Sequence, residues 1–366
     1  MQLGAYTTMM SVFKCDHLGS TVPIARFPVR YEAIGSVDAQ GVIGVLEKYK
    51  TALKRLDAQL DGLTAEYHRP KFRFWLDAFY CYLVHGASPR DYINFGFYRL
   101  NNLERKQFVT MKRSFRIERV LNPTQYAEIF NNKHRFNEVF SGFVNRRWIY
   151  APESSKSEIV EFIRQVGKVV VKPTGLSSGQ GIYVLDSREI AEYHDVCIEA
   201  TERGYLIEEF IQQHPEVAKL NPSTVNTVRL YTLIGKTGVC DIIFALLRVG
   251  MADACVDNFH SGGVGYVIDI DSGVVKQPGL DIMGNEYLYH PGTNILMVGF
   301  KIPKWDELKS FVLEAANVIP ESRYIGWDVA LTEEGFEIVE GNYMADPGLL
   351  QSLDKVGKYK LFKKAL

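Results

Sequence analysis

The spacing of apolar residues predicts that the first third of the chain is mainly helical. From Val42 to Leu63 the apolar positions alternate between spacings of four and three residues, the pattern of one face of a long helix. This spacing also fits a coiled-coil seam and leaves a homodimer open, but helices with such a face usually pack on their own domain. The aromatic-rich residues 70–86 predict a second, buried helix, and Ser88 followed by Pro89 indicates the start of a third.

Helical and strand patterns alternate after residue 120. The predicted helices cover residues 156–166, 189–203 and 305–317, and the predicted strands cover 169–171, 182–185, 205–207, 227–234, 239–248 and 265–270. Mixed elements of this kind indicate an α+β fold. We therefore expect three parts: a mainly helical region at 1–120, which would bind an acceptor or mediate oligomerisation, and two α+β regions at 121–204 and 205–366.

A hairpin is predicted near the C-terminus, where two short apolar strands flank the polar turn 332–335. If the turn is centred on Glu334, Asp328 lies opposite Glu340, and Asn342 lies on the same face. Two carboxylates and an amide oxygen on one face suit Mg²⁺. The prediction depends on the register, because a one-residue slip would separate the acids. Ordinary acids on a solvated hairpin are the alternative.

The composition of the chain argues against several classes of protein. Apolar residues make up 46% and charged residues 23% of the 366-residue chain, as in ordinary globular proteins. The net charge of −1 argues against a broad surface for nucleic acid or anionic membrane, and no apolar run is long enough for a transmembrane segment. The five cysteines show no CxxC spacing, which favours reduced thiols and a cytoplasmic location over disulfides or a zinc site.

A β-branched run ends at Lys172 and leads into a loop rich in glycine and serine, residues 174–181. Glycines let backbone N–H groups approach phosphate oxygens, and a lysine at this point supplies positive charge. The loop is not a P-loop, because no Gly-Lys-Ser/Thr follows the glycines. A simple hairpin loop is an equally good interpretation of the glycines alone.

Further polar residues interrupt the predicted strands. Glu208 and Glu209, bracketed by large apolar residues, could form a slot for a planar base, or simply an exposed pair of acids at a strand end. Arg229 and Arg248 lie in strands, where a guanidinium needs an anionic partner such as phosphate or carboxylate. A salt bridge to a protein acid, for example Asp241 or Asp269, would satisfy them equally.

In this order the features resemble the ATP-grasp superfamily, from about Asn131 to Asn342. More narrowly, several segments are similar to the sugar-transfer-associated ATP-grasp family. These segments are Asp91-Tyr92-Ile93-Asn94-Phe95-Gly96-Phe97-Tyr98, Asn132-Lys133-His134-Arg135-Phe136, Gln213-His214-Pro215, Asn226-Thr227-Val228-Arg229 and Asp257-Asn258-Phe259-His260-Ser261-Gly262-Gly263. The helical front region departs from the superfamily, whose members commonly begin with a Rossmann-like α/β subdomain.

The resemblance implies a role for each matching residue. Lys133 and Lys172 would contact the α- and β-phosphates of ATP. The ribose would lie near Gln213 or His214. Alternatively, Glu216 would take the place of the acidic residue that usually binds the ribose in this superfamily. Further nucleotide contacts are implied for the phosphate loop (Ser177, Ser178, Gly179, Gly181), the adenine slot (Glu208, Glu209, Phe210, Ile211) and the glycine-rich loop (Asn258, His260).

The same resemblance implies the reactive groups. Arg248 would stabilise the γ-phosphate, and Arg229 would hold a phosphate or the substrate carboxylate. Asp328, Glu340 and Asn342 would hold two magnesium ions, which agrees with the hairpin geometry.

The implied activity is an ATP-dependent carboxylate–amine ligase that works through an acylphosphate. We expect it to join an amino acid or small carboxylic acid to a sugar during cell-surface polysaccharide biosynthesis, with no nucleic-acid partner. A phosphotransferase on the same fold and a nucleotide-binding scaffold without turnover are the alternatives.

Overall fold

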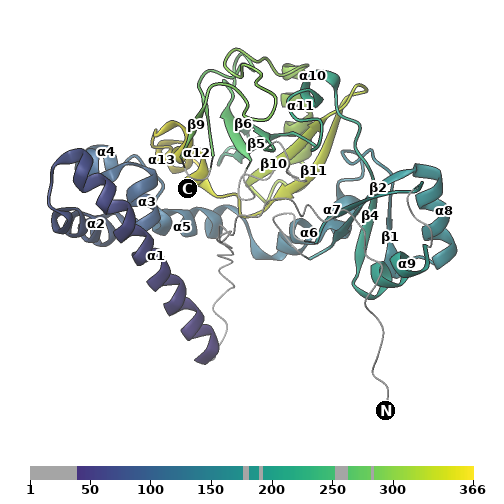
Figure 1. The fold of residues 1–366 in the computed structure, drawn as a ribbon, viewed down its shortest axis with the longest axis horizontal. Helices are drawn as coiled ribbons and strands as arrows, with labels where there is room; N and C mark the ends of the chain where they lie inside the picture. Colours follow the sequence, from purple (N-terminus) through teal and green to yellow (C-terminus); the bar gives the residue numbers. More distant parts are fainter. Residues whose placement is uncertain (1–38, 176–180, 189–192, 252–262, 282–283) are drawn as a thin grey trace. The chain divides into compact units, whose positions relative to one another are not determined.

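The computed structural model describes residues 39–175, 181–188, 193–251, 263–281 and 284–366, all within the compact unit Val37–Leu366. The chain runs through a series of helices and then through two antiparallel sheets with their own helices (Figure 1). The predicted α+β class and helical N-terminal region are therefore confirmed. Within the described ranges, no helix combines the length and the apolar character needed to cross a membrane.

Helices fill the N-terminal part of the described chain. Leu56, Leu60 and Leu63 of the first helix are buried against Phe74 of the second, so this part of the predicted apolar face packs on its own domain. The predicted helix start at Ser88 is confirmed, because its side chain forms a capping box. The bounds are α1 Ala39–Tyr67, α2 Lys71–His85, α3 Pro89–Asn94, η1 Phe97–Arg99, α4 Asn102–Arg105, α5 Met111–Leu121, η2 Thr124–Tyr126, α6 Ala127–Asn131 and α7 Lys133–Val139.

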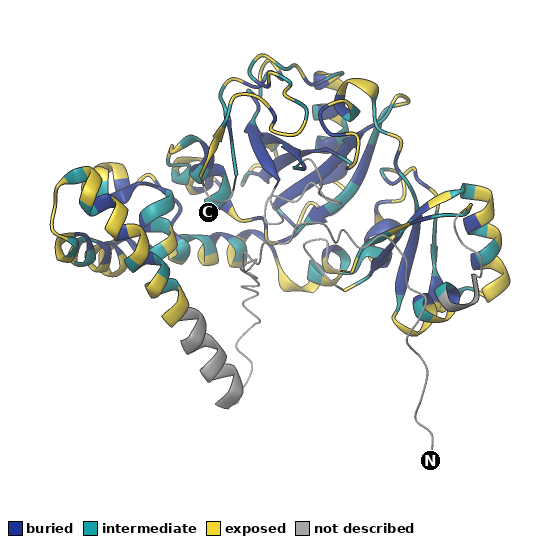
Figure 2. Ribbon diagram, viewed as in Figure 1, coloured by how far each residue is buried: buried dark blue, intermediate teal, exposed yellow. Residues whose placement is uncertain are grey.

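Only one side of α2 is buried, so the prediction of a buried helix at 70–86 is wrong for its other side. The buried side chains are Phe74, Ala78, Cys81 and His85. On the opposite side, large apolar residues are exposed (Figure 2). The sequence could not distinguish the two sides, because both are apolar.

A four-stranded antiparallel sheet has the order β1-β4-β2-β3. One face packs against α8 and α9, and the other carries Lys172 and Glu208, which lie on neighbouring strands. β4 pairs with both β1 and β2, so the domain boundary predicted at 204/205 falls before the last strand of this sheet. The elements are β1 Trp148–Tyr150, η3 Ala151–Glu153, α8 Lys156–Val166, β2 Lys168–Pro173, β3 Tyr183–Asp186, α9 Tyr193–Glu202 and β4 Tyr205–Glu209.

A seven-stranded sheet follows, with the order β11-β10-β5-β6-β7-β8-β9. One face packs on α11, and one end of the other face is covered by α5, α12 and α13. The other end of that face carries charged residues, most of which are buried as well. The elements are α10 Pro215–Ala218, β5 Thr227–Ile234, β6 Cys240–Val249, β7 Val264–Val267, β8 Gly279–Leu280, β9 Glu286–Tyr287, α11 Trp305–Ala316, β10 Tyr324–Leu331, β11 Phe336–Asn342, α12 Pro347–Asp354 and α13 Tyr359–Lys363.

The terminal hairpin has the predicted pairing at its acids, although its register is irregular. Asp328 pairs with Glu340, as predicted, whereas Val329 pairs with Ile338. Val339 is therefore the extra residue of a β-bulge. Without this bulge, the register near the turn would place Val339 opposite Asp328 and would turn Glu340 to the other face.

A buried arginine links the two sheets. Arg146 precedes β1, and its Nη2 donates to Glu208 Oε1 of the small sheet at 2.8 Å. Its Nη1 donates to Glu337 Oε1 of the large sheet at 2.6 Å. Glu208 also forms an ion pair with Lys172. Burial alone opposes ionisation of Glu208, but Arg146 and Lys172 outweigh this effect and lower the pKa of its carboxyl group.

We predict that Arg146→Leu destabilises the protein by roughly 3–5 kcal/mol, because Glu208 and Glu337 would lose a buried cationic partner. Urea unfolding followed by circular dichroism measures this change. The neighbouring Arg147 is the matched control, because its pair with Glu209 is largely exposed and Arg147→Leu should cost only about 0–1 kcal/mol. Equal effects of the two substitutions would contradict the linking role of Arg146.

Candidate functional site

One end of the large sheet carries two arginines around one carboxylate, and all three side chains are buried. Arg229 on β5 lies directly opposite Asp328 on β10, and its Nη2 donates to Asp328 Oδ2 at 2.6 Å. Arg248 on β6 donates from Nη1 to both oxygens of Asp328 at 3.1 Å. The arginines therefore have a protein acid as partner, but it is Asp328 and not the predicted Asp241 or Asp269.

The two acids of the hairpin have different electrostatic environments. Burial opposes ionisation of Asp328, but Arg229 and Arg248 outweigh it and lower the pKa of Asp328 to about 2. Burial and the neighbouring charge of Asp328 raise the pKa of Glu340. One carboxylate is thus held ionised by arginines, and the other would gain most from an additional cation.

The side-chain amide of Asn342 lies close to the carboxylates of both Asp328 and Glu340. Its Nδ2 lies 3.5 Å from Asp328 Oδ2 and 3.4 Å from Glu340 Oε1, and reversing the amide would bring Oδ1 to the same place. Among the described residues there is no group of three His, Cys, Asp or Glu side chains placed to hold a metal. Two carboxylates and an amide oxygen nevertheless fit Mg²⁺, which usually takes one or two carboxylates together with phosphate oxygens.

The two predicted phosphate-binding lysines lie at the end of β2. The backbone N–H of Lys133 donates to Thr174 O at 3.3 Å, and Lys133 Nζ donates to Pro173 O at 3.1 Å. Burial and Asp328 raise the pKa of Glu340, and the charge of Lys133 offsets a part of this rise. The helix α7 therefore brings Lys133 close both to the end of β2, which carries Lys172, and to the acids of the hairpin.

The predicted adenine-slot residues lie at the end of β4 and just after it. Glu208 is buried in its ion pairs with Arg146 and Lys172, so the alternative of an exposed pair of acids is wrong for this residue. Phe210 stacks with Lys168 Nζ at 4.0 Å from the ring centre, and Ile211 is buried. Contact of these side chains with adenine remains a prediction.

The predicted ribose residues have structural partners. Gln213 Oε1 accepts the Asn226 N–H at 2.7 Å, and Gln213 Nε2 donates to Thr224 O at 2.5 Å. His214 caps α10 by accepting the Glu216 N–H. Both side chains therefore hold the segment after β4 in place, and their role at a ribose remains a prediction.

Several predicted nucleotide contacts lie outside the described residues: Ser177, Ser178, Gly179, Asn258 and His260. Gly181 is described and has φ of 70°, a left-handed conformation that glycine adopts without strain.

One arginine and two glycines near the site were not predicted from the sequence. Arg146 gave no signal beyond a pair of arginines before a strand. Gly326 and Gly341 were not singled out either, although each permits a close contact. A Cβ at Gly326 would lie 3.4 Å from Arg229 Nη1, and a Cβ at Gly341 would lie 2.8 Å from Phe136 of α7.

The two antiparallel sheets, with lysines on one and an acid–arginine cluster on the other, define the class of this protein as ATP-grasp. The family model "Sugar-transfer associated ATP-grasp" matches residues 112–357, more than half of the chain. The chain belongs to the sugar-transfer associated ATP-grasp family.

The chain is also distantly similar to several solved structures. The ATP-grasp ligase PsnB, bound to a phosphomimetic variant of its minimal precursor, Mg and ADP, is 14% identical, with TM-score 0.39 and coverage of 66% of this chain and 62% of PsnB. D-alanine–D-alanine ligase from Bacillus anthracis is 12% identical, with TM-score 0.40 and coverage of 66% and 71%. D-alanyl-alanine synthetase A from Vibrio cholerae is 13% identical, with TM-score 0.36 and coverage of 60% and 56%.

The chain spans 62% of the length of the first of these structures. No curated protein matches the sequence. Similarity at this distance says nothing about the substrate of this chain.

We predict that Gly341→Ala destabilises the protein by roughly 1–3 kcal/mol, because the new methyl group would overlap the rings of Phe130 and Phe136. Since Gly341 lies between Glu340 and Asn342, Mg²⁺ affinity should fall as well. Urea unfolding and isothermal titration with Mg²⁺-nucleotide measure the two effects. Gly335→Ala in the turn of the same hairpin is the control, because no atom lies within 4 Å of its Cβ position. Equal stability of the two variants would contradict the packing argument.

Proposed function

We propose that this protein is an ATP-dependent carboxylate–amine ligase. Its substrates would be an amino acid or another small carboxylic acid and an amine on a sugar, joined during cell-surface polysaccharide biosynthesis. The proposal rests on one observation. Two arginines, two carboxylates and an amide lie close together on one face of the large sheet: Arg229, Arg248, Asp328, Glu340 and Asn342. Cations and hard oxygen ligands side by side suit a phosphate being transferred.

Each group has a proposed task. Mg²⁺, when bound by Asp328, Glu340 and Asn342, would neutralise the phosphate oxygens of ATP. Lys133 and Lys172 would hold the phosphates from the side of the small sheet. Their positive charges and the arginines would position ATP and substrate without a covalent nucleophile on the protein.

Arg229 is suited to hold the substrate carboxylate. Its Nε and Nη2 donate to Asp328, which fixes the plane of the guanidinium. Gly326 has no side chain to cover Nη1, whereas a Cβ there would lie 3.4 Å from that atom. In the proposed complex, Nη1 would donate to an oxygen of the substrate carboxylate.

The proposed reaction has two steps. A carboxylate oxygen attacks the γ-phosphorus of ATP, the bond to the bridging oxygen breaks, and ADP leaves. The amine nitrogen then attacks the acylphosphate carbon, inorganic phosphate leaves with the electrons of the C–O bond, and the nitrogen loses its proton to solvent. Amide, ADP and phosphate are the products.

The first test is release of ADP and phosphate with Mg²⁺-ATP across a panel of amino acids, uronic acids and amino sugars, with product masses measured in parallel. We expect ADP and phosphate in equal amounts and a product mass equal to the two substrates less water. ADP release with a phosphorylated product would favour a phosphotransferase instead. Nucleotide binding without any release would favour a scaffold.

We predict that Glu340→Gln lowers turnover at least about 100-fold, because a metal ligand loses its charge. The fold should be retained, since the amide has the same shape as the carboxylate, and a thermal melt checks this. Glu334→Gln in the exposed turn of the same hairpin is the control and should leave turnover unchanged. Wild-type turnover in Glu340→Gln would refute the metal site.

A further inference from the structure

The exposed side of α2 is a continuous apolar stripe. Phe72, Leu76, Phe79 and Leu83 follow one another at spacings of four, three and four residues, so they lie on one face of the helix. Their exposed fractions are 59%, 63%, 60% and 63%. Tyr80 and Tyr82 flank the stripe and are also exposed.

Such a helix needs a second apolar environment. A helix that is apolar all round is normally buried on all sides or in contact with lipid. Among the described residues, the core of the helical region covers the side of Phe74, Ala78 and Cys81. Exposed apolar patches of this kind mark sites of protein or membrane contact.

The charge of the surrounding segment favours an anionic partner. Residues 69–119 contain eleven lysines and arginines but four aspartates and glutamates, a local surplus of seven positive charges. The net charge of −1 for the whole chain hides this surplus. A two-fold dimer would place the same basic surface against itself, so the charge opposes a second copy of this chain as the partner.

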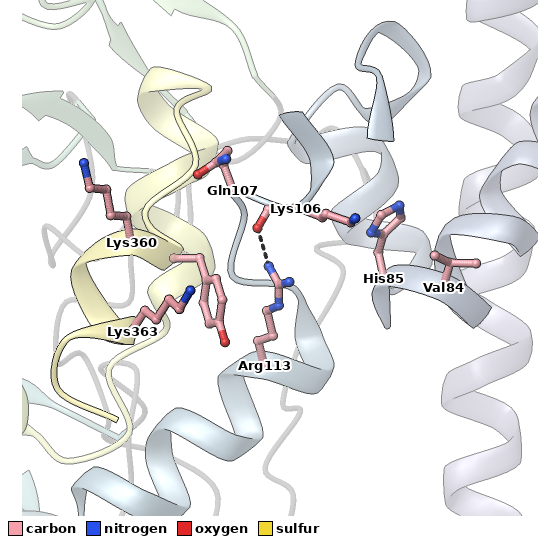
Figure 3. A pocket seen from close by; sticks show the side chains of 8 residues that line it. Val84, His85, Lys106, Gln107, Arg113, Lys360 and Lys363 are labelled. Atoms are coloured by element: carbon pink, nitrogen blue, oxygen red, sulfur yellow. Dashed lines mark hydrogen bonds between the residues drawn. The ribbon is translucent and has the colours of Figure 1, made fainter. Parts of the chain in front are cut away.

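A basic pocket begins where the stripe ends. Its volume is about 400 Å³, and Val84, next to Leu83 in the chain, is one of its lining residues. Figure 3 shows Arg113 between α13, which carries Lys360 and Lys363, and two other residues: Lys106, which follows α4, and His85, the last residue of α2. Within the part of the chain that the structure describes, no acidic residue lines this pocket, and no lining residue belongs to the predicted ATP or metal site.

Arg113 is fixed in this pocket without a carboxylate partner in the described ranges. Its Nη1 donates to Lys106 O and Phe108 O, both at 2.7 Å, and its guanidinium stacks on the Tyr359 ring at 3.9 Å. Partial burial lowers its pKa. A guanidinium held by neutral groups beside three lysines is suited to bind the phosphate of a partner.

We propose that α2 and this pocket form a membrane-docking surface: the apolar stripe inserts into an anionic bilayer, and the pocket of Lys106, Arg113, Lys360 and Lys363 receives a lipid phosphate. Amphipathic helices with aromatic and leucine residues on one side and basic residues beside them bind bilayers in this way. The protein would then act on substrates at the membrane surface.

The experiment is co-sedimentation of the full chain with vesicles of phosphatidylcholine alone or mixed in equal amounts with phosphatidylglycerol. We expect binding to the mixed vesicles, weakened by salt, and little binding to the neutral ones. Leu76→Ser/Phe79→Ser should lower the partition coefficient at least about tenfold, because two inserted side chains are removed. Lys360→Ala/Lys363→Ala should lower it several-fold, by roughly the attraction of two charges to the surface.

Control substitutions lie in the exposed turn between β5 and β6 and near Val275. Val239→Ser matches the apolar change, and Lys236→Ala/Lys301→Ala matches the charge change. Both controls should bind as the wild type does. Circular dichroism checks that every variant is folded.

Absence of binding to the mixed vesicles would overturn the proposal, and so would wild-type binding by Leu76→Ser/Phe79→Ser. A dimer in sedimentation that this variant dissociates, together with no vesicle binding, would assign the stripe to a second copy instead. Wild-type binding by the lysine variant would overturn the phosphate pocket. Vesicle binding requires neither ATP nor turnover, so its outcome is independent of the proposed ligase activity.

Discussion

The structure depends on one buried cation, Arg146, placed between the carboxylates of two sheets. Glu208 belongs to the small sheet and Glu337 to the large one, and each accepts a hydrogen bond from a different nitrogen of the same guanidinium. Buried carboxylates are costly without such partners. The arrangement therefore fixes how β4 approaches β11. Glu208 on β4 lies beside Lys172, and β11 carries two of the predicted metal ligands, Glu340 and Asn342.

The charged end of the large sheet follows the same rule of mutual neutralisation. Asp328 is ionised because two arginines surround it, and those arginines are tolerated inside the sheet because Asp328 is there. Two arginines are thus held close to the carboxylates of Asp328 and Glu340, and neither arginine is a buried charge without a partner. A phosphate or carboxylate arriving there would meet donors that are already oriented, which is the condition for electrostatic catalysis.

Periodicity predicted the elements well where one face of each is apolar. The helix at 156–166 and the strand at 227–234 have the predicted bounds. Asp328 pairs with Glu340, as predicted from a turn centred on Glu334, but beside the turn Leu331 pairs with Phe336, so the predicted pairing depends on the bulge. The bulge at Val339 was not predicted, because it depends on how β11 pairs with β10 rather than on the local sequence. Arg146 could not be recognised, since its burial requires Glu337, which lies 191 positions further along the chain. The sequence also gave no way to tell the buried side of α2 from its exposed side.

The position of Gly341 has a thermodynamic consequence. On one face of β11, Glu340 and Asn342 point to the predicted metal, while on the other face Gly341 lies against Phe130 and Phe136. Phe136 is part of α7, the helix that begins with Lys133. A shift of α7 as Lys133 binds a phosphate would therefore press on the strand between the two metal ligands. Nucleotide and metal would then share a coupling free energy, and by reciprocity each would change the affinity for the other by the same factor.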